Sequence, residues 1–400
     1  MLEALKSDIT KNYYDPTFHG IDLDAHFKAA DEKVKQATSL GQVFGIIAQA
    51  LLDFNDSHLY FLPPGRSNRY EYGWRMAMIG DDCFVTAVKP GSDAEKKGLQ
   101  PGDKIYSIDG YEPTRENHWK MLYAYYGLRP KAGVRLVVIK PGGEEKQLDV
   151  MTKIQLGKPV LSFADINDIE REEEDAERAR RAGSRLAEVS DDLIIWKLAA
   201  FDLSPSEVDD AMAKVRKHKV LILDLRGNGG GAEDALLRLV GNFLSEDYKI
   251  GDIKRRKETR PLVAKTRAGD NVFKGKLVVL IDSQSGSAAE LFARVVQLQK
   301  RGVVVGDRSA GAVMRARLYD HQSGVESVAV YFASITDADI TMADGKSLEH
   351  VGVQPDHLML PTASDMAAGQ DSVLAFAASL FDIKLDAKKA GSLFPERWRP

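Results

Sequence analysis

Unbroken aliphatic runs that alternate with helix-length segments are the feature that most restricts the fold of this chain. After residue 192 these runs occupy 193–196, 220–225, 277–281 and 303–305. Amphipathic segments lie between them, at 206–218, 232–244 and 288–299. Strands buried on both faces are rich in Val, Ile and Leu without polar alternation, and parallel neighbours are joined by helical crossovers. We therefore predict an α/β core with a parallel sheet over residues 191–385, followed by a C-terminal tail at 386–400.

Two further units are predicted to precede this core. Residues 1–66 are expected to be mainly helical, because apolar residues recur there at helical spacing, namely Leu2, Leu5, Ile9, Val43, Ile46, Ile47, Ala50 and Leu51. The run Pro63-Pro64-Gly65 ends this segment. Residues 70–152 contain short strands and two helices separated by turns, which predicts a small, partly open barrel.

A charge-dense stretch separates the second unit from the core. In residues 165–189 acidic side chains dominate the first half and arginines the second half, an order that suits the dipole of a helix. We predict a charged helical linker over 160–190. A solvated surface helix is the simpler interpretation, and a helix that docks a partner is the alternative.

Composition excludes several classes of protein. The chain has 400 residues and a net charge of −4, so no general attraction to nucleic acid is expected. Its one cysteine, Cys83, excludes an intrachain disulfide framework and a thiolate metal cluster. No apolar run is long enough for a transmembrane helix. The first 20 residues lack the apolar core of a signal peptide, so we expect a periplasmic or secreted protein if a signal was removed and a cytoplasmic one otherwise.

A turn of small residues, Ser285-Gly-Ser-Ala-Ala-Glu290, lies between an aliphatic strand and a helix. A serine at such a turn is exposed at the end of the sheet, and the first N–H groups of the helix have no intrahelical partner. These donors can hold an oxyanion. Ser287 is therefore the candidate nucleophile, and Ser283 and Ser285 are expected to serve the turn and the helix cap.

A second glycine-rich turn, Asp224-Leu-Arg-Gly-Asn-Gly-Gly-Gly231, follows the buried strand at 220–225. It is not a phosphate-binding P-loop, because no Gly-Lys-Ser/Thr follows, and its spacing does not fit a dinucleotide fingerprint. Its glycines allow close approach of backbone N–H groups to a bound atom. A tight turn is one interpretation, and a contribution to an oxyanion hole beside Ser287 is the favoured one.

These two turns resemble the core signatures of the S41 peptidases, the C-terminal-processing and tricorn-core family. Two later segments are similar to the family in the same order, Val304-Val-Gly-Asp-Arg-Ser-Ala-Gly311 and Glu349-His-Val-Gly-Val-Gln-Pro-Asp356. Residues 83–110 resemble a PDZ domain. The resemblance covers roughly residues 20–385 and implies a crotonase/ClpP-like core with an inserted PDZ-like domain and an N-terminal helical segment.

The resemblance also implies the site. Ser287 matches the nucleophile, and the amides of Ala288 and of Gly229 or Gly230 would form the oxyanion hole. The C-terminal-processing branch activates its serine with a lysine in a Gly-Lys sequence, but here Gly311 is followed by Ala312 and no lysine occurs between Lys300 and Lys346. The tricorn-like branch uses a Ser-His pair and a late glutamate instead. Ser57, His58 and Glu349 match those positions.

The chemistry of the side chains favours the same choice of base. A serine hydroxyl needs a base whose pKa lies near the working pH, and histidine meets this need without a large shift. His58 is the predicted base, and His350 is its rival. Either Ser57 or Glu349 is expected to orient the imidazole.

We therefore expect a serine endopeptidase that acts on polypeptides, with no cofactor and no metal site, since the histidines are scattered. A PDZ-like unit adds a peptide as an extra strand and holds its C-terminal carboxylate. The residues that match this function are Gly73, Trp74, Arg75 and Met76; the alternative is a packing or gating unit with a blocked groove. Two rival functions stay open, an inactive peptide-binding protein and a hydrolase of small esters or amides. A homo-oligomer also stays open.

Overall fold

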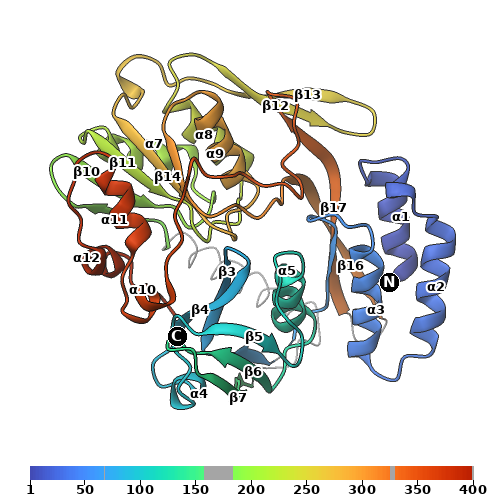
Figure 1. The fold of residues 1–400 in the computed structure, drawn as a ribbon. Helices are drawn as coiled ribbons and strands as arrows, with labels where there is room; N and C mark the ends of the chain where they lie inside the picture. The colour runs from blue at the N-terminus through green and yellow to red at the C-terminus, as the bar shows by residue number, and fades with distance from the viewer. Residues whose placement is uncertain (67, 157–182, 325–328, 399–400) are drawn as a thin grey trace.

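A six-stranded sheet forms the centre of the molecule. The computed structural model describes residues 1–66, 68–156, 183–324 and 329–398. The strand order is β18-β15-β14-β11-β10-β9, with bounds His357–Leu358, Val303–Gly306, Lys276–Ile281, Val220–Asp224, Leu193–Lys197 and Arg185–Glu188. All neighbours from β10 to β18 are parallel, and only β9 is antiparallel. The predicted parallel sheet is confirmed (Figure 1).

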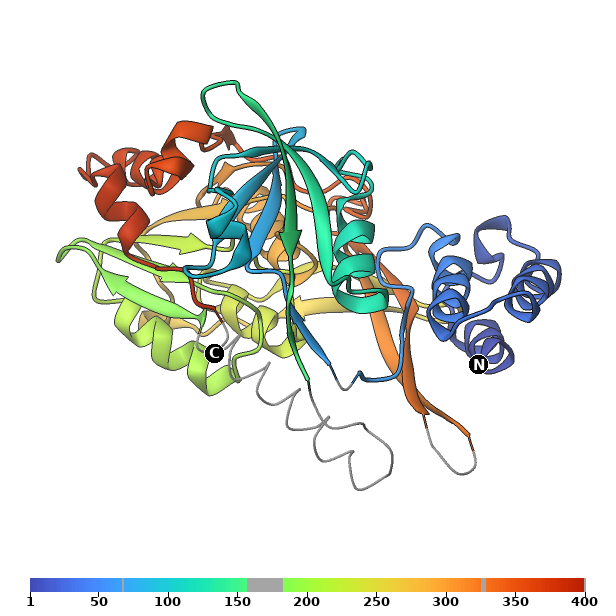
Figure 2. The same ribbon diagram turned by 90° about the horizontal axis from the view of Figure 1, so that it is seen from below.

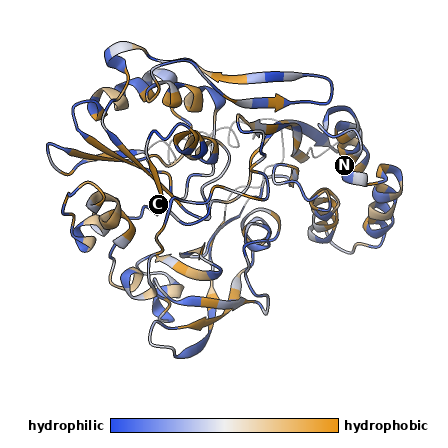
Figure 3. Ribbon diagram, turned by 45° about the horizontal axis from the view of Figure 1, so that its top comes forward, coloured by the Kyte–Doolittle hydropathy of each residue, from blue (hydrophilic) through white to orange (hydrophobic). Residues whose placement is uncertain are grey.

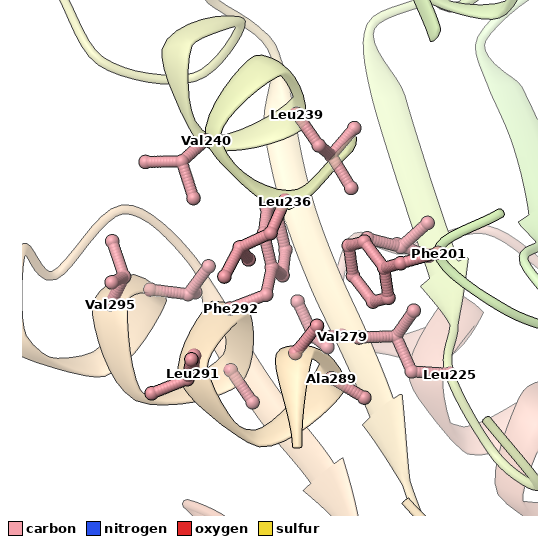
Figure 4. Close-up of a cluster of buried hydrophobic side chains, with 14 of the residues drawn as sticks. Phe201, Leu225, Leu236, Leu239, Val240, Val279, Ala289, Leu291, Phe292 and Val295 are labelled. Carbon is pink, nitrogen blue, oxygen red and sulfur yellow. The ribbon is translucent and has the colours of Figure 1, made fainter. Parts of the chain in front are cut away.

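Helices cover both faces of this sheet, which explains why its strands are apolar throughout. On one face lie α7 (Pro205–Val215), α8 (Glu233–Gly241) and α9 (Ala288–Leu298). Figure 4 shows Leu236 of α8 and Phe292 of α9 packed above Val279 of β14. Burying each large aliphatic or aromatic side chain contributes about 1.5–3 kcal/mol. The strands are the most uniformly apolar elements of the core (Figure 3).

The C-terminal region covers the opposite face. Helices α11 (Ser372–Ser379) and α12 (Ala387–Ser392) pack on the alternate side chains of the same strands, such as Ile222 and Leu280. A short helix, α10 (Ala363–Ala367), precedes them. The predicted tail at 386–400 thus contains a helix, and Ala390 of that helix is buried in the core.

A second, antiparallel sheet was not predicted. Strands β1, β17, β12 and β13 pair in that order, and β16 also pairs with β17; their bounds are Tyr60–Leu62, Ala329–Met342, Tyr248–Lys254, Thr259–Ala264 and Met314–Ser323. Strand β17 is 14 residues long and runs from the core to the N-terminal helices (Figures 1 and 2). It therefore joins the two ends of the chain in space.

The N-terminal helices pack on the far half of β17. They are α1 (Leu2–Asn12), α2 (Leu23–Lys35) and α3 (Leu40–Leu52), with a short 3-10 turn, η1 (Phe18–Gly20). The predicted apolar positions Leu5, Ile9 and Leu51 are fully buried in one cluster with Ala333 and Ile335 of β17. This packing places the end of α3, and the Ser57-His58 pair after it, beside the sheet.

A five-stranded antiparallel sheet forms the unit at 70–152. Its order is β3-β4-β5-β6-β7, with bounds Trp74–Ile79, Asp82–Val88, Lys104–Ile108, Gly133–Ile139 and Glu145–Met151. Helices α4 (Asp93–Lys96), α5 (His118–Leu122) and η2 (Tyr123–Leu128) complete it, and β2 (Arg69–Glu71) pairs with β8 (Lys153–Gln155) at its base. Strand β3 lies at the edge of the sheet.

Most of the predicted linker, 160–190, lies outside the described residues, which resume at 183. The prediction of helix up to residue 189 is wrong at residues 185–188. These residues form β9, because their backbone pairs with the otherwise open edge of β10 and Leu186 packs against the core.

Candidate active site

Ser287 has an unusual backbone conformation at the start of α9. Its φ of 51° and ψ of −118° lie in a region that non-glycine residues seldom adopt, at a cost of order 1–3 kcal/mol. The strain is balanced by two hydrogen bonds, because the amide of Ser287 donates to the carbonyl of Ala312 at 2.9 Å and to Oε2 of Glu290 at 3.0 Å. The turn thus presents the serine above the end of β14.

Gly230 makes this arrangement sterically possible. Its φ is +105°, and a Cβ at this position would lie 2.6 Å from Cβ of Ser287. Only glycine allows the second turn to approach the nucleophile this closely. At Gly229 an added Cβ would meet no atom within 4 Å.

Two open amides flank Ser287. The amide of Gly230 donates to Oδ1 of Asn228 at 2.8 Å, so it is already used inside the turn. Within the described part of the chain, the amides of Gly229 and Ala288 have no hydrogen-bond acceptor. Of the two glycines predicted for an oxyanion hole, Gly229 is therefore the one whose donor is open.

Glu290 is a functional residue that the sequence reasoning did not select. Its carboxylate is fully buried and accepts four hydrogen bonds, from Ser309 Oγ at 2.6 Å and from the amides of Gly311, Ala312 and Ser287 at 2.7–3.0 Å. Burial raises the pKa of Glu290 to about 7, although these donors oppose the shift. The signal was present in the sequence, since a glutamate three residues after a serine is typical of a helix N-terminus.

The predicted base lies in a second network, at the end of α3. Nδ1 of His58 is 2.7 Å from Oγ of Ser57, and that hydroxyl donates to Oε2 of Glu349 at 3.0 Å. Oε1 of Glu349 also accepts from the amide of Ser57 at 3.0 Å. Ser57 and Glu349 therefore act in series on the imidazole, rather than as alternatives.

A segment that we call the strap, Ser309–Val313, joins the two networks. The carbonyl of Ala312 accepts from Ser287, and the next amide, that of Val313, donates to Oε2 of Glu349 at 2.7 Å. Ser287 and Glu349, which are distant in sequence, thus bond to consecutive residues of the strap. No hydrogen bond joins His58 to Ser287 among the described residues.

His350, the rival base, is hydrogen-bonded to a backbone carbonyl. Its Nε2 lies 2.8 Å from the carbonyl oxygen of Asn55 and 3.5 Å from Oε1 of Glu349, and its side chain is about half exposed. Because a carbonyl can only accept, Nε2 of His350 carries a proton in this bond. Burial lowers the pKa of His58 below 6.5, although Glu349 and Asp56 oppose the shift. His58 is thus the neutral imidazole with a ring nitrogen left for chemistry.

The other serines and charged residues of the two turns serve structure. Ser285 Oγ donates to the carbonyl of Leu225 at 2.8 Å, and Ser283 Oγ donates to the carbonyl of Met78 at 2.6 Å. Asp224 and Arg226 form a buried ion pair that continues to Asp371. The contacts of Ser285 agree with the expectation that it serves the turn, whereas Ser283 instead bonds to strand β3 of the unit at 70–152.

The four residues predicted for peptide binding are in contact with other parts of the chain. Gly73 lies against Ser92, and the Trp74 side chain is buried. Gln284 Nε2 donates to the carbonyl of Met76 at 3.2 Å. Arg75 pairs with Glu396, donates to the carbonyl of Arg397 at 3.1 Å, and lies 4.9 Å from the centre of the Trp398 ring.

Among the residues that the structure describes, no group of three or more His, Cys, Asp or Glu side chains is placed to hold a metal ion. None of the helices in the same residues is long and apolar enough to cross a membrane.

Comparisons with known families agree with the motifs. Residues 194–359 match the family model of peptidase family S41, and residues 84–123 match that of the PDZ domain. The first range contains both turns, the strap and Glu349. It begins after Ser57 and His58, which lie outside it.

Curated relatives are similar over most of this chain. The probable CtpA-like serine protease of Staphylococcus haemolyticus is 24% identical over 288 residues, which cover 71% of this chain and 51% of the relative. The tail-specific protease of Haemophilus influenzae is 24% identical, with 72% and 41% covered. The chloroplastic C-terminal processing peptidase of Tetradesmus obliquus is 24% identical, with 89% and 75% covered. The chain thus spans about half the length of the first two relatives.

Solved structures share the fold at low identity. The structure of a CPAF mutant superposes with a TM-score of 0.67 at 13% identity, and covers 96% of this chain and 98% of its own. The photosystem II D1 C-terminal processing protease gives a TM-score of 0.52 at 19% identity, with 90% and 92% covered. The solved structures show a shared fold, and the family models show that the chain contains a peptidase family S41 region at 194–359 and a PDZ domain region at 84–123.

Proposed function

We propose that this protein is a serine endopeptidase in which Ser287 is the nucleophile and His58 is the general base. Oγ of Ser287 attacks the carbonyl carbon of a peptide bond while Nε2 of His58 takes the hydroxyl proton. The same proton then goes to the leaving amine, and water hydrolyses the acyl-enzyme by the reverse sequence. The observation that carries the proposal is the strap, which holds the Ser287 turn on one side and the Ser57–His58–Glu349 network on the other.

The hydrogen bonds of His58 support its role as a base. Glu349 as a carboxylate can only accept, so Ser57 donates to it and accepts from Nδ1–H of His58. This leaves Nε2 without a proton, as a general base requires. When the imidazole takes a proton from Ser287, the charge of Glu349 stabilises it through Ser57.

The two open amides support the role of Ser287. A tetrahedral intermediate carries negative charge on one oxygen, and each fixed donor aimed at that oxygen contributes about 3 kcal/mol. We assign these donors to Gly229 and Ala288. The reaction also needs Ser287 Oγ and His58 Nε2 about 2.6–3.2 Å apart, a contact that often forms only when substrate is bound.

The proposal also covers the fold of the catalytic core and the class of substrate. We place the catalytic core at 191–385 and assign it the crotonase/ClpP-like fold, with the parallel sheet of β10 to β18 as support. The PDZ domain, at 70–152, would take a polypeptide substrate along the edge of β3. Because several relatives are named as C-terminal processing peptidases, an exposed C-terminus is the substrate feature we propose.

Hydrolysis of an unstructured protein tests the proposed activity. We expect the wild type to cleave casein, Ser287→Ala to lose the activity, and His58→Ala to lose about 10²–10⁴-fold in kcat. His350→Ala is the matched control and should retain activity, since its Nε2 faces a carbonyl. Equal cleavage by the wild type and Ser287→Ala would contradict the proposal. Hydrolysis of a small ester but no peptide would favour the rival hydrolase, and no turnover of either would favour an inactive binding protein.

A further inference from the structure

Asp56 precedes the Ser57-His58 pair and is one of few fully buried acids in this part of the molecule. Its side chain is 3% exposed. Oδ1 accepts from the amide of His58 at 2.8 Å and from Oγ1 of Thr336 at 2.7 Å, and Oδ2 accepts from the hydroxyl of Tyr13 at 2.9 Å. One carboxylate thus receives donors from three separate parts of the chain.

Each of these donors fixes a different element. Thr336 is buried in the middle of β17, whose backbone also holds Tyr14 through a 3.0 Å hydrogen bond. Tyr13 follows α1 and is fully buried among aromatic rings, at 5.4 Å from the ring of Phe54. The carboxylate therefore connects helix α1 and strand β17 to the backbone of the predicted base.

The bond to His58 is the one that bears on catalysis. The hydrogen bond from the His58 amide to Asp56 fixes the position of the His58 backbone, while the bond between Nδ1 of His58 and Ser57 fixes the orientation of the imidazole ring. An error of about 1 Å in the position of a catalytic group can cost about 100-fold in rate. The base needs both constraints; Glu349 acts on the ring through Ser57 and on the neighbouring amide of Ser57, whereas Asp56 bonds to the amide of His58 itself.

We propose that Asp56 is a positioning residue for His58, and that through Tyr13 it makes helix α1 a required part of the active site. This inference rests on the proposed function, because it assumes that His58 is the base. It adds a residue to the site and gives the N-terminal helices a role in the reaction. Asp56 touches no reacting atom, and its effect reaches Ser287 only through His58.

Single hydroxyl deletions test this inference with little risk to the fold. Tyr13→Phe removes one donor to the carboxylate and keeps the buried ring. We expect the rate of Ser287 labelling by a fluorophosphonate probe, and kcat on casein, to fall about tenfold, as for a lost hydrogen bond to a charged group. KM should change little, and the melting temperature should fall by only a few degrees, because a hydrogen bond to a charged group also contributes about 1.5–3 kcal/mol to stability. Tyr14→Phe is the matched control, because both hydroxyls lie near Nε2 of His19, at 2.9 Å for Tyr14 and 3.4 Å for Tyr13, but among the described residues only that of Tyr13 donates to Asp56.

Substitutions of Asp56 itself separate positioning from stability. Asp56→Ala should slow labelling about 100-fold. Asp56→Asn should recover most of this loss, because its Oδ1 still accepts from His58 and Thr336 while its amide donates to the Tyr13 oxygen. Thr336→Val, which keeps the shape of the side chain, should resemble Tyr13→Phe. If Asp56→Ala does not fold, the Tyr13→Phe and Thr336→Val variants still decide the question.

The outcomes distinguish this inference from the proposed function. If the wild type is labelled at Ser287 and the Tyr13→Phe and Thr336→Val variants differ from it only in melting temperature, Asp56 is structural and the inference is overturned. If labelling falls equally in Tyr13→Phe and Tyr14→Phe, helix α1 has no specific role and the inference is overturned again. If the wild type itself is not labelled at Ser287, the proposed function fails instead.

Discussion

Individual residues of this site are defined by the contacts that hold them more than by their type. Ser287 differs from the neighbouring serines because its backbone is held at a φ of 51° by two acceptors and by a glycine packed on its Cβ. Ser287 and His58 could be predicted from the motifs. The spacing of Glu290 marks a helix cap, but its bonds to the strap, 19–22 positions away, could not be predicted, and neither could those of Asp56, whose partners lie up to 280 positions away.

The contact between Gly230 and Ser287 gives a paired prediction. In Gly230→Ala the new Cβ would lie 2.6 Å from Cβ of Ser287, at a φ that favours glycine. We expect a loss of about 1–3 kcal/mol of stability and of most probe labelling. Gly229→Ala adds a Cβ in open space and keeps its amide, so it should retain most activity. Similar activities in the two variants, measured with equal amounts of folded protein, would contradict the proposed geometry.

The loss of activity at acidic pH should reflect the protonation of His58. Burial lowers the pKa of His58 below 6.5, so the imidazole stays neutral to lower pH than a free histidine. We predict that kcat/KM falls on acidification with a midpoint below pH 6.5. A pH profile of the wild type and of the His350→Ala control measures this. A midpoint above 6.5 in both proteins would argue against His58 as the base.

The buried carboxyl group of Glu290 gives a prediction for stability. Its pKa in the folded protein is about 7, above the ordinary 4.5, so the folded state holds the proton more tightly than the unfolded state. This contribution is complete below pH 4.5 and is lost as the pH rises through 7, on the order of 3 kcal/mol in all. The free energy of unfolding in urea should therefore decline from pH 4.5 to 8 more in the wild type than in Glu290→Gln. Parallel curves would show that Glu290 does not titrate in this range.

At the scale of elements, strand β17 is the part that sequence patterns did not reveal. The parallel strands were predictable because they are apolar on both faces. Strand β17 pairs with β1, which precedes the parallel core in sequence, and with β12 and β16, which lie between strands of that core, so no local pattern marks its pairing with β1 and β12. Its length is what allows the N-terminal helices and the core to share one site.

The PDZ domain yields a prediction about the C-terminal segment. Arg75, which was predicted to assist with a substrate carboxylate, is instead engaged by Glu396, Arg397 and Trp398. Removal of residues 396–400 should free Arg75 and strengthen the binding of a peptide with a free C-terminus. Fluorescence anisotropy with a labelled peptide measures this, and Arg75→Ala in the shortened chain is the control. Equal binding by the full and shortened chains would show that the segment does not compete.

At the scale of the whole molecule, the site is assembled from both ends of the chain. The resemblance to a Ser-His arrangement, and the missing lysine after Gly311, predicted that His58 would meet the core. The strap and β17 supply the contacts for that meeting, and no sequence pattern indicated them. The activity should consequently depend on the docking of the N-terminal helices, which a base within the core would not require.

Covalent labelling of Ser287 tests the central claim most directly. The protein is treated with a fluorophosphonate probe, and the adduct is counted by intact mass and located by peptide mapping. We predict one adduct, on Ser287, absent in Ser287→Ala, slowed about 10²-fold or more in His58→Ala, and unchanged in His350→Ala. An adduct on Ser287 that forms as fast without His58 as with it, or no adduct at all, would contradict the account.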